Sequence, residues 1–192
     1  MTKMKKAYLI HGWGGNPNSE GWFSWLREEC KKRDIELIIP AMPDTNSPKI
    51  DEWINKIEET VSLNYNQEVY FIGHSIGCQA IMRYLDKINK KINGIVFVAP
   101  WMKLDMNTIK KESKKVLDIA KPWVETPINF NKVKKLSGKI RGIFSDNDPY
   151  VPLSETKFFK EKLGAEIIIK ENEGHFNNTD KIPEIIDFIN KK

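Results

Sequence analysis

Residues 69–77 read Val-Tyr-Phe-Ile-Gly-His-Ser-Ile-Gly, and this stretch decides the fold. Residues 69–72 are β-branched or aromatic, which predicts a short buried strand. Apolar residues then recur at helical spacing as far as residue 88, which predicts a helix. The Gly-x-Ser-x-Gly turn between them is typical of a nucleophile elbow, where a strained strand-to-helix turn exposes the serine hydroxyl. Glycine suits positions 73 and 77, because a Cβ at either would crowd the neighbouring strand and helix. Ser75, at the centre of the turn, is therefore the candidate nucleophile.

Strand-like runs alternate with helical patterns on both sides of this stretch. The runs cover residues 7–10, 35–39, 69–72, 95–98, 140–144 and 165–169. Residues 95–98 show no polar alternation, as expected of a strand covered on both faces. Repeated βα units predict one α/β domain over residues 1–192, with a mostly parallel sheet between layers of helices. Ser47 followed by Pro48 predicts a helix start.

The least regular segment runs from Trp101 to about residue 137, between the fourth and fifth strand-like runs. It has one predicted helix containing Ile109, Val116 and Ile119, followed by a proline-containing stretch. An excursion this long over the carboxyl edge of a sheet is where a pocket wall would lie. We therefore expect residues 101–137 to form a small cap.

The composition excludes several classes of function. The net charge is +5, and lysines cluster at residues 110–115 and 132–135. Those clusters have no interleaved aromatic residues and no nucleic-acid-binding module around them, so they indicate a solvated face and no nucleic-acid partner. The apolar run at residues 7–10 is too short for a signal peptide, and no stretch approaches the roughly 20 apolar residues of a membrane span.

The two cysteines, Cys30 and Cys78, each lie among apolar neighbours of a predicted helix. They form neither a disulfide framework nor a metal-ligand spacing, so we expect reduced core residues. These features predict a cytoplasmic protein with no membrane partner, present as a monomer or weak homodimer.

A serine hydroxyl needs a base, and the chain has 3 histidines. His74 precedes the candidate nucleophile, so its side chain should point away from the Ser75 hydroxyl. His11 begins the loop after the first strand, where it would shape the site. His175 lies in a glycine-flanked loop after the last strand, at the carboxyl edge of the sheet, and is the predicted base.

The acid is expected between nucleophile and base in chain order. The loop Ser145-Asp146-Asn147-Asp148-Pro149 offers two aspartates. A calcium loop of the EF-hand type is excluded, because Tyr150 and Val151 stand where an oxygen ligand and a glycine are needed. One aspartate should close the turn and the other should accept the His175 ring N–H. Pro149 favours an extended backbone at Asp148, so Asp148 is preferred and Asp146 stays open.

Acyl transfer also requires hydrogen-bond donors for an oxyanion. The backbone N–H of Ile76, after the nucleophile, is one predicted donor. The loop after the first strand, Gly12-Trp13-Gly14-Gly15, permits close backbone approach, and the N–H of Trp13 is the predicted second donor.

Four segments together resemble a known family: residues 11–15 (His-Gly-Trp-Gly-Gly), 73–77, 145–152 (Ser-Asp-Asn-Asp-Pro-Tyr-Val-Pro) and 174–176 (Gly-His-Phe). They are similar to the small serine hydrolases related to retinoblastoma-binding protein nine. The resemblance implies a compact α/β-hydrolase fold of about six strands in the order 2-1-3-4-5-6. It places the family's nucleophile on Ser75, its acid on Asp148 and its base on His175. The family's Leu-x-Cys-x-Glu motif is absent, so that binding partner is not carried over.

The sequence therefore predicts a serine hydrolase that cleaves a small acyl ester without cofactor or metal, with amide and thioester substrates left open. Trp101, Tyr150 and Phe176 are expected to form, with Trp13, the walls of an apolar acyl pocket. Two alternatives stay open. One is a non-catalytic interaction module on the same fold, and the other is acyl transfer to an acceptor other than water, which shares the acyl-enzyme intermediate.

Overall fold

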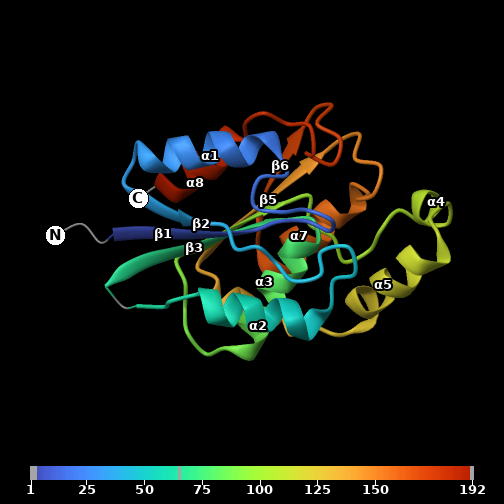
Figure 1. Ribbon diagram of the computed structural model, residues 1–192, viewed down its shortest axis with the longest axis horizontal. Helices are drawn as coiled ribbons and strands as arrows, with labels where there is room; N and C mark the ends of the chain where they lie inside the picture. The colour runs from blue at the N-terminus through green and yellow to red at the C-terminus, as the bar shows by residue number, and fades with distance from the viewer. Residues whose placement is uncertain (1–3, 65, 191–192) are drawn as a thin grey trace.

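A 6-stranded parallel sheet in the order β2-β1-β3-β4-β5-β6 forms the centre of the molecule (Figure 1). The computed structural model describes residues 4–64 and 66–190. The strands are β1 (Met4–Ile10), β2 (Ile35–Ile38), β3 (Gln67–His74), β4 (Gly94–Val98), β5 (Lys139–Ser145) and β6 (Glu166–Lys170). The strand order is the expected 2-1-3-4-5-6 order of the α/β-hydrolase fold. All neighbouring strands are parallel. Their carboxyl ends therefore lie at one edge of the sheet.

Helices cover both faces of this sheet. They are α1 (Gly21–Lys31), α2 (Ile50–Thr60), α3 (Ile76–Lys87), α4 (Met106–Ile109), α5 (Lys114–Glu125), α6 (Phe130–Leu136), α7 (Ser154–Leu163) and α8 (Pro183–Asn190). Helices α1 and α8 pack together on one face, whereas α2, α3, α6 and α7 form the layer on the other (Figure 1). Every residue of β4 is buried, as the absence of polar alternation in its sequence indicated.

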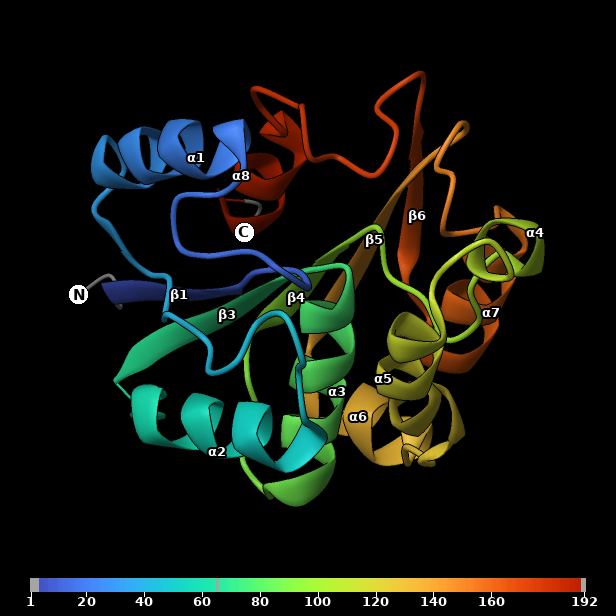
Figure 2. The ribbon, with the colours of Figure 1, turned by 45° about the vertical axis from the view of Figure 1, so that its right-hand side comes forward.

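The segment between β4 and β5 differs from its sequence interpretation. Ile109 and Val116, expected in one helix, belong to the separate helices α4 and α5. In Figure 2, α4 and α5 lie beyond the carboxyl ends of the strands, beside α3 and α7. Helix α6, within the same segment, packs against α3 and α7 as part of the main body. The part that lies outside the main body, residues 101–125, is called the outlying segment, and it is shorter than the expected cap of residues 101–137.

The start of α2 is another difference. Ser47 does not cap the helix, because α2 begins at Ile50 with an extended Lys49 as its N-cap. The chain before it is held by tertiary contacts, since the indole N–H of Trp123 donates to the Pro48 carbonyl at 3.0 Å. A cap-proline pattern is a local signal, and here packing against α5 overrides it.

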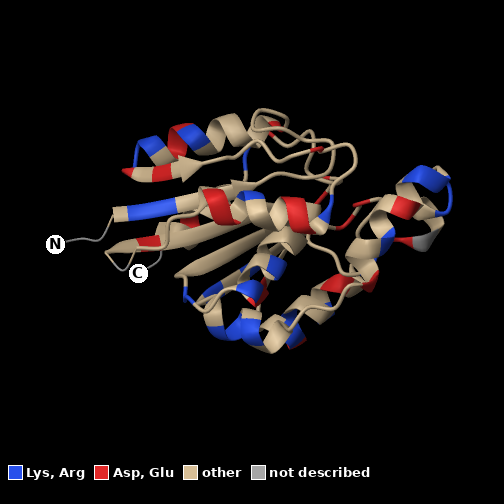
Figure 3. Cartoon of the chain, turned by 60° about the horizontal axis from the view of Figure 1, so that its bottom comes forward, with Lys and Arg blue, Asp and Glu red and all other residues tan. Residues whose placement is uncertain are grey.

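Charged residues of both signs occur on most helices. Figure 3 shows acidic positions interspersed among the basic ones, so the net charge of +5 is spread over several elements. Among the helices of the described residues, none has both the length and the apolar character needed to cross a membrane.

Candidate active site

Ser75 lies between the end of β3 and the start of α3, in a strained backbone conformation. Its φ is 53° and its ψ is −122°, a region that non-glycine residues rarely occupy. The backbone N–H of Ser75 donates to Val98 at 2.9 Å, which ties the turn to the end of β4.

The flanking glycines permit this turn. A Cβ on Gly77 would overlap the carbonyl oxygens of Ile10 and His11 in β1 and its loop, and one on Gly73 would lie 2.8 Å from Cα of Cys78. The expectation that both positions are crowded by a neighbouring strand and helix is confirmed.

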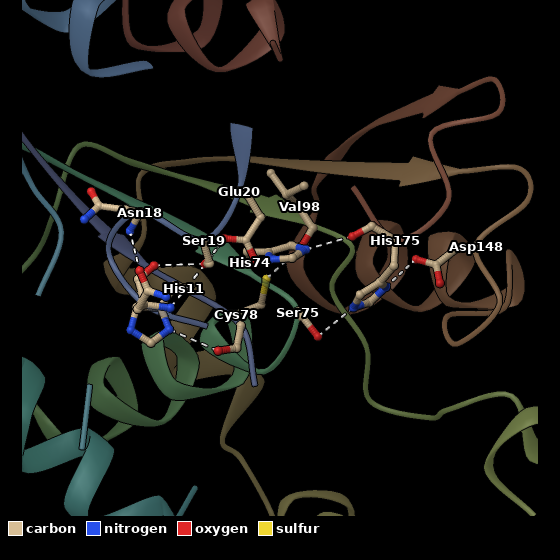
Figure 4. A network of polar contacts seen from close by, with 12 residues as sticks. His11, Asn18, Ser19, Glu20, His74, Ser75, Cys78, Val98, Asp148 and His175 are labelled. Carbon is tan, nitrogen blue, oxygen red and sulfur yellow. Dashed lines mark hydrogen bonds and ion pairs between the residues drawn. The ribbon is translucent and has the colours of Figure 1, made fainter. Parts of the chain in front are cut away.

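Ser75, His175 and Asp148 form a continuous hydrogen-bonded chain (Figure 4). His175 Nε2 lies 2.9 Å from Ser75 Oγ, and His175 Nδ1 lies 2.8 Å from Asp148 Oδ2. Because a carboxylate only accepts, Nδ1 carries the ring proton and Nε2 accepts from the serine hydroxyl. This tautomer allows the imidazole to take the hydroxyl proton.

Asp148 combines the two roles that the sequence divided between two aspartates. Its Oδ1 accepts the backbone N–H groups of Tyr150 at 2.9 Å and Val151 at 3.1 Å, closing the turn, while Oδ2 accepts from His175. Asp146 points elsewhere, since its Oδ1 accepts the N–H of Asn172 at 2.8 Å and so joins the loops after β5 and β6.

The other two histidines are buried and support the loops around Ser75. His11 Nδ1 lies 3.0 Å from the Gly12 carbonyl, and its Nε2 accepts the N–H of Met42 at 3.3 Å. His74 Nε2 lies 2.9 Å from the backbone carbonyl of His175, and its Nδ1 lies 3.5 Å from Oε1 of Glu20 (Figure 4). The His74 ring thus points away from the Ser75 hydroxyl, as predicted.

Burial sets the protonation of His175. It disfavours the imidazolium and lowers the pKa of His175 below its ordinary value, although the hydrogen bond to Asp148 acts in the opposite direction. Burial likewise lowers the pKa of His11. A neutral His175 is the form that can accept a proton from Ser75.

The two residues predicted to donate to an oxyanion lie at the same cavity as Ser75. Trp13 and Ile76 both line the cavity above Ser75, and Ile76 begins α3. Within residues 4–64 and 66–190, neither backbone N–H has an acceptor. Free N–H groups at a helix start are suited to stabilising negative charge.

The cavity has a volume of about 260 Å³ and opens over Ser75 and His175. Its far wall comes from the outlying segment and is mostly apolar; the residues are Trp101, Leu104, Ile109, Glu112, Val116 and Ala120. Tyr150 also lines it, with its ring 5.2 Å from that of His175.

Phe176 does not line the cavity. It is fully buried in the hydrophobic core, because the chain turns at a φ of 61° after His175 and directs the two side chains apart. The expectation that it forms a pocket wall therefore needs correction.

Sequence reasoning missed three polar residues. Arg83 and Glu155 hold the outlying segment in place, and Glu20 lies beside His74. Arg83 of α3 donates to the carbonyls of Trp123 at 2.8 Å and Thr126 at 2.9 Å, and Glu155 of α7 accepts the N–H of Met102 at 2.5 Å. Arg83 interrupts the run Ile81-Met82-Arg83-Tyr84-Leu85, and a charge among apolar neighbours was a usable signal. Glu20 and Glu155 stand in ordinary polar contexts that gave none.

The chain is similar to known proteins over most of its length. The protein YdeN of Bacillus subtilis (strain 168) is 25% identical over 177 residues, covering 90% of this chain and 86% of its own. Its crystal structure superposes with a TM-score of 0.80 at 23% identity, over 96% of each chain. Serine hydrolase RBBP9 of Rattus norvegicus is 24% identical over 182 residues, 94% of this chain and 91% of its own.

A more distant structure, from work on carboxylesterases of the thaumarchaeon Nitrososphaera gargenis, shares the fold. Its TM-score is 0.71 at 16% identity, over 97% of this chain and 88% of that one. Residues 7–185 match the family described as Serine hydrolase. With this match over most of its length, the chain belongs to the Serine hydrolase family.

Proposed function

We propose that this protein is a carboxylesterase that hydrolyses small acyl esters through a Ser75-His175-Asp148 triad. The observation that carries the proposal is the pair of contacts from His175, 2.9 Å to Ser75 Oγ and 2.8 Å to Asp148 Oδ2, beneath an apolar cavity. The cavity volume of about 260 Å³ favours a small acyl group, because sites for drug-sized ligands start at roughly 300 Å³.

In the proposed reaction, Ser75 Oγ attacks the ester carbonyl while His175 Nε2 takes its proton. His175 then protonates the leaving alcohol as the C–O bond breaks, and an acyl-enzyme remains on Ser75. Water, deprotonated by His175, releases the carboxylic acid and restores the serine. The N–H groups of Trp13 and Ile76 would bind the oxyanion, and Trp101 and Tyr150 would contact the acyl or alcohol group.

The first test uses a fluorophosphonate probe on the parent protein and on Ser75→Ala. We expect labelling of the parent only, followed by hydrolysis of p-nitrophenyl esters that declines as the acyl chain outgrows the cavity. A folded parent protein that is not labelled would contradict the proposal and favour a non-catalytic interaction module. Labelling that persists in Ser75→Ala would assign the chemistry to another residue.

A further inference from the structure

A second carboxylate and histidine lie beside the proposed triad and line the same cavity. Glu20, in the loop before α1, and His74, at the end of β3, are both buried (Figure 4). The His74 ring centroid is 5.3 Å from that of His175, and Trp22 lies edge-on to it at 6.0 Å. Glu20 Oε2 also accepts a hydrogen bond from Ser19 Oγ. The reaction described above assigns no role to this pair.

The contacts of His74 determine where its protons lie. Nε2 is 2.9 Å from the backbone carbonyl of His175, which only accepts, so Nε2 carries a proton. Nδ1 is 3.5 Å from Glu20 Oε1, and a lone pair facing a buried carboxylate would be repulsive. Burial opposes ionisation of Glu20, but the interactions with His74, Ser19 and His11 together outweigh it and lower the pKa of the carboxyl. His74 Nδ1 makes no hydrogen bond among the described residues, and the Glu20 carboxylate lies within ion-pair distance of it.

The loop that carries His175 depends on this arrangement. Its N–H groups before His175 are held by the loop after β5: Glu173 donates to Ser145 Oγ at 3.0 Å and Gly174 to Asn147 Oδ1 at 2.7 Å. The next backbone group along the loop, the carbonyl of His175, accepts a hydrogen bond from His74 Nε2 of β3. The titratable groups around the His175 ring are Asp148 in the loop after β5, His74 at the end of β3 and Glu20 in the loop before α1.

We propose that Glu20 is a positioning residue. Glu20 orients the His74 ring, and the Nε2–H of His74 then anchors the backbone carbonyl of His175 so that the imidazole of His175 stays in reach of Ser75 Oγ. This inference rests on the proposed esterase function, because it assigns Glu20 an effect on the rate of serine acylation. It does not place Glu20 in contact with the reacting atoms.

A direct role in substrate binding is the competing explanation, since Glu20 also lines the cavity. The two roles affect different kinetic constants. Loss of a substrate contact raises KM with kcat unchanged, whereas misplacement of His175 lowers kcat. A misplacement of about 1 Å can reduce a rate about 100-fold.

The experiment compares Glu20→Ala, Glu20→Gln and the parent protein in p-nitrophenyl ester hydrolysis at pH 8, with circular dichroism and melting temperature as folding checks. We expect Glu20→Ala to lower kcat about 10- to 100-fold with KM changed less than twofold. Glu20→Gln should recover most of kcat, because its amide N–H can donate to Nδ1 and keep the Nε2–H tautomer. Glu184→Ala, which removes the ion pair with Lys170 outside the cavity, controls for general destabilisation.

Parent-like kcat in Glu20→Ala, a change in KM alone, or a Glu20→Gln variant as slow as Glu20→Ala would overturn the inference. If Glu20→Ala fails to fold, His74→Gln and His74→Leu decide instead. The glutamine amide can donate to the His175 carbonyl, so His74→Gln should be the faster by about 10-fold, and equal rates would overturn the inference. Failure of the esterase proposal is distinguishable, since the parent protein itself would then be inactive and unlabelled.

Discussion

Replacing Asp148 with asparagine should abolish catalysis and leave the fold intact. The side-chain oxygen of asparagine would keep the two turn hydrogen bonds, from Tyr150 N–H at 2.9 Å and Val151 N–H at 3.1 Å. The amide nitrogen would then occupy the position of Oδ2, 2.8 Å from His175 Nδ1. Because an amide N–H donates, Nδ1 must become the acceptor and the ring proton moves to Nε2. In that tautomer, Nε2 no longer accepts from Ser75.

The wrong tautomer is expected to lower kcat by about 10⁴-fold. Since each tenfold loss corresponds to about 1.4 kcal/mol, this is about 5 kcal/mol of lost transition-state stabilisation. Stability should change by only about 1 kcal/mol, because the turn keeps its backbone bonds and one neutral hydrogen bond replaces the charge-assisted one.

The assay is the rate of ester hydrolysis and of fluorophosphonate labelling, together with urea unfolding. Asp146→Asn is the matched control, because Asp146 accepts one backbone N–H in the neighbouring loop and makes no contact with His175 among the described residues. We expect it to retain activity within a few-fold. The reasoning is refuted if Asp148→Asn keeps more than a tenth of the parent activity, or if both variants lose activity equally.

Three further predictions follow from the same structure. Burial lowers the pKa of His175, so the acidic limb of kcat/KM should have its midpoint below about 6.5, and a midpoint above 7 would contradict this. Gly77→Ala should destabilise the protein by about 3 kcal/mol in urea unfolding, because its Cβ overlaps the Ile10 and His11 carbonyls. Arg83→Met should cost about 2 kcal/mol and speed proteolytic cleavage between residues 101 and 126, because the Trp123 and Thr126 carbonyls lose their donor. Unchanged cleavage would show that Arg83 does not hold this segment.

The sequence alone predicted the architecture and most of the residues that meet at Ser75. Short apolar runs and helical spacing located the βα units, because strands covered on both faces and helices with one buried face leave these patterns in the sequence. The crowding at Gly73 and Gly77 was also readable, since a strand-to-helix turn this tight excludes a side chain there. Asp148 and His175 were placed at the same sheet edge as Ser75 because parallel strands share that edge, with the family resemblance supporting the choice between two aspartates.

Other features were decided only by the tertiary structure. Phe176 enters the core because the backbone at the loop reverses direction after His175, and no local pattern specifies that φ. Ser47 fails to cap α2 because Trp123, 75 positions away from Pro48, binds the intervening backbone. Glu20 reaches His74 from a loop 54 positions away. Local periodicity records which face of an element is buried, whereas the partners of a buried polar group depend on how distant loops pack, and that information appears only when the chain is folded.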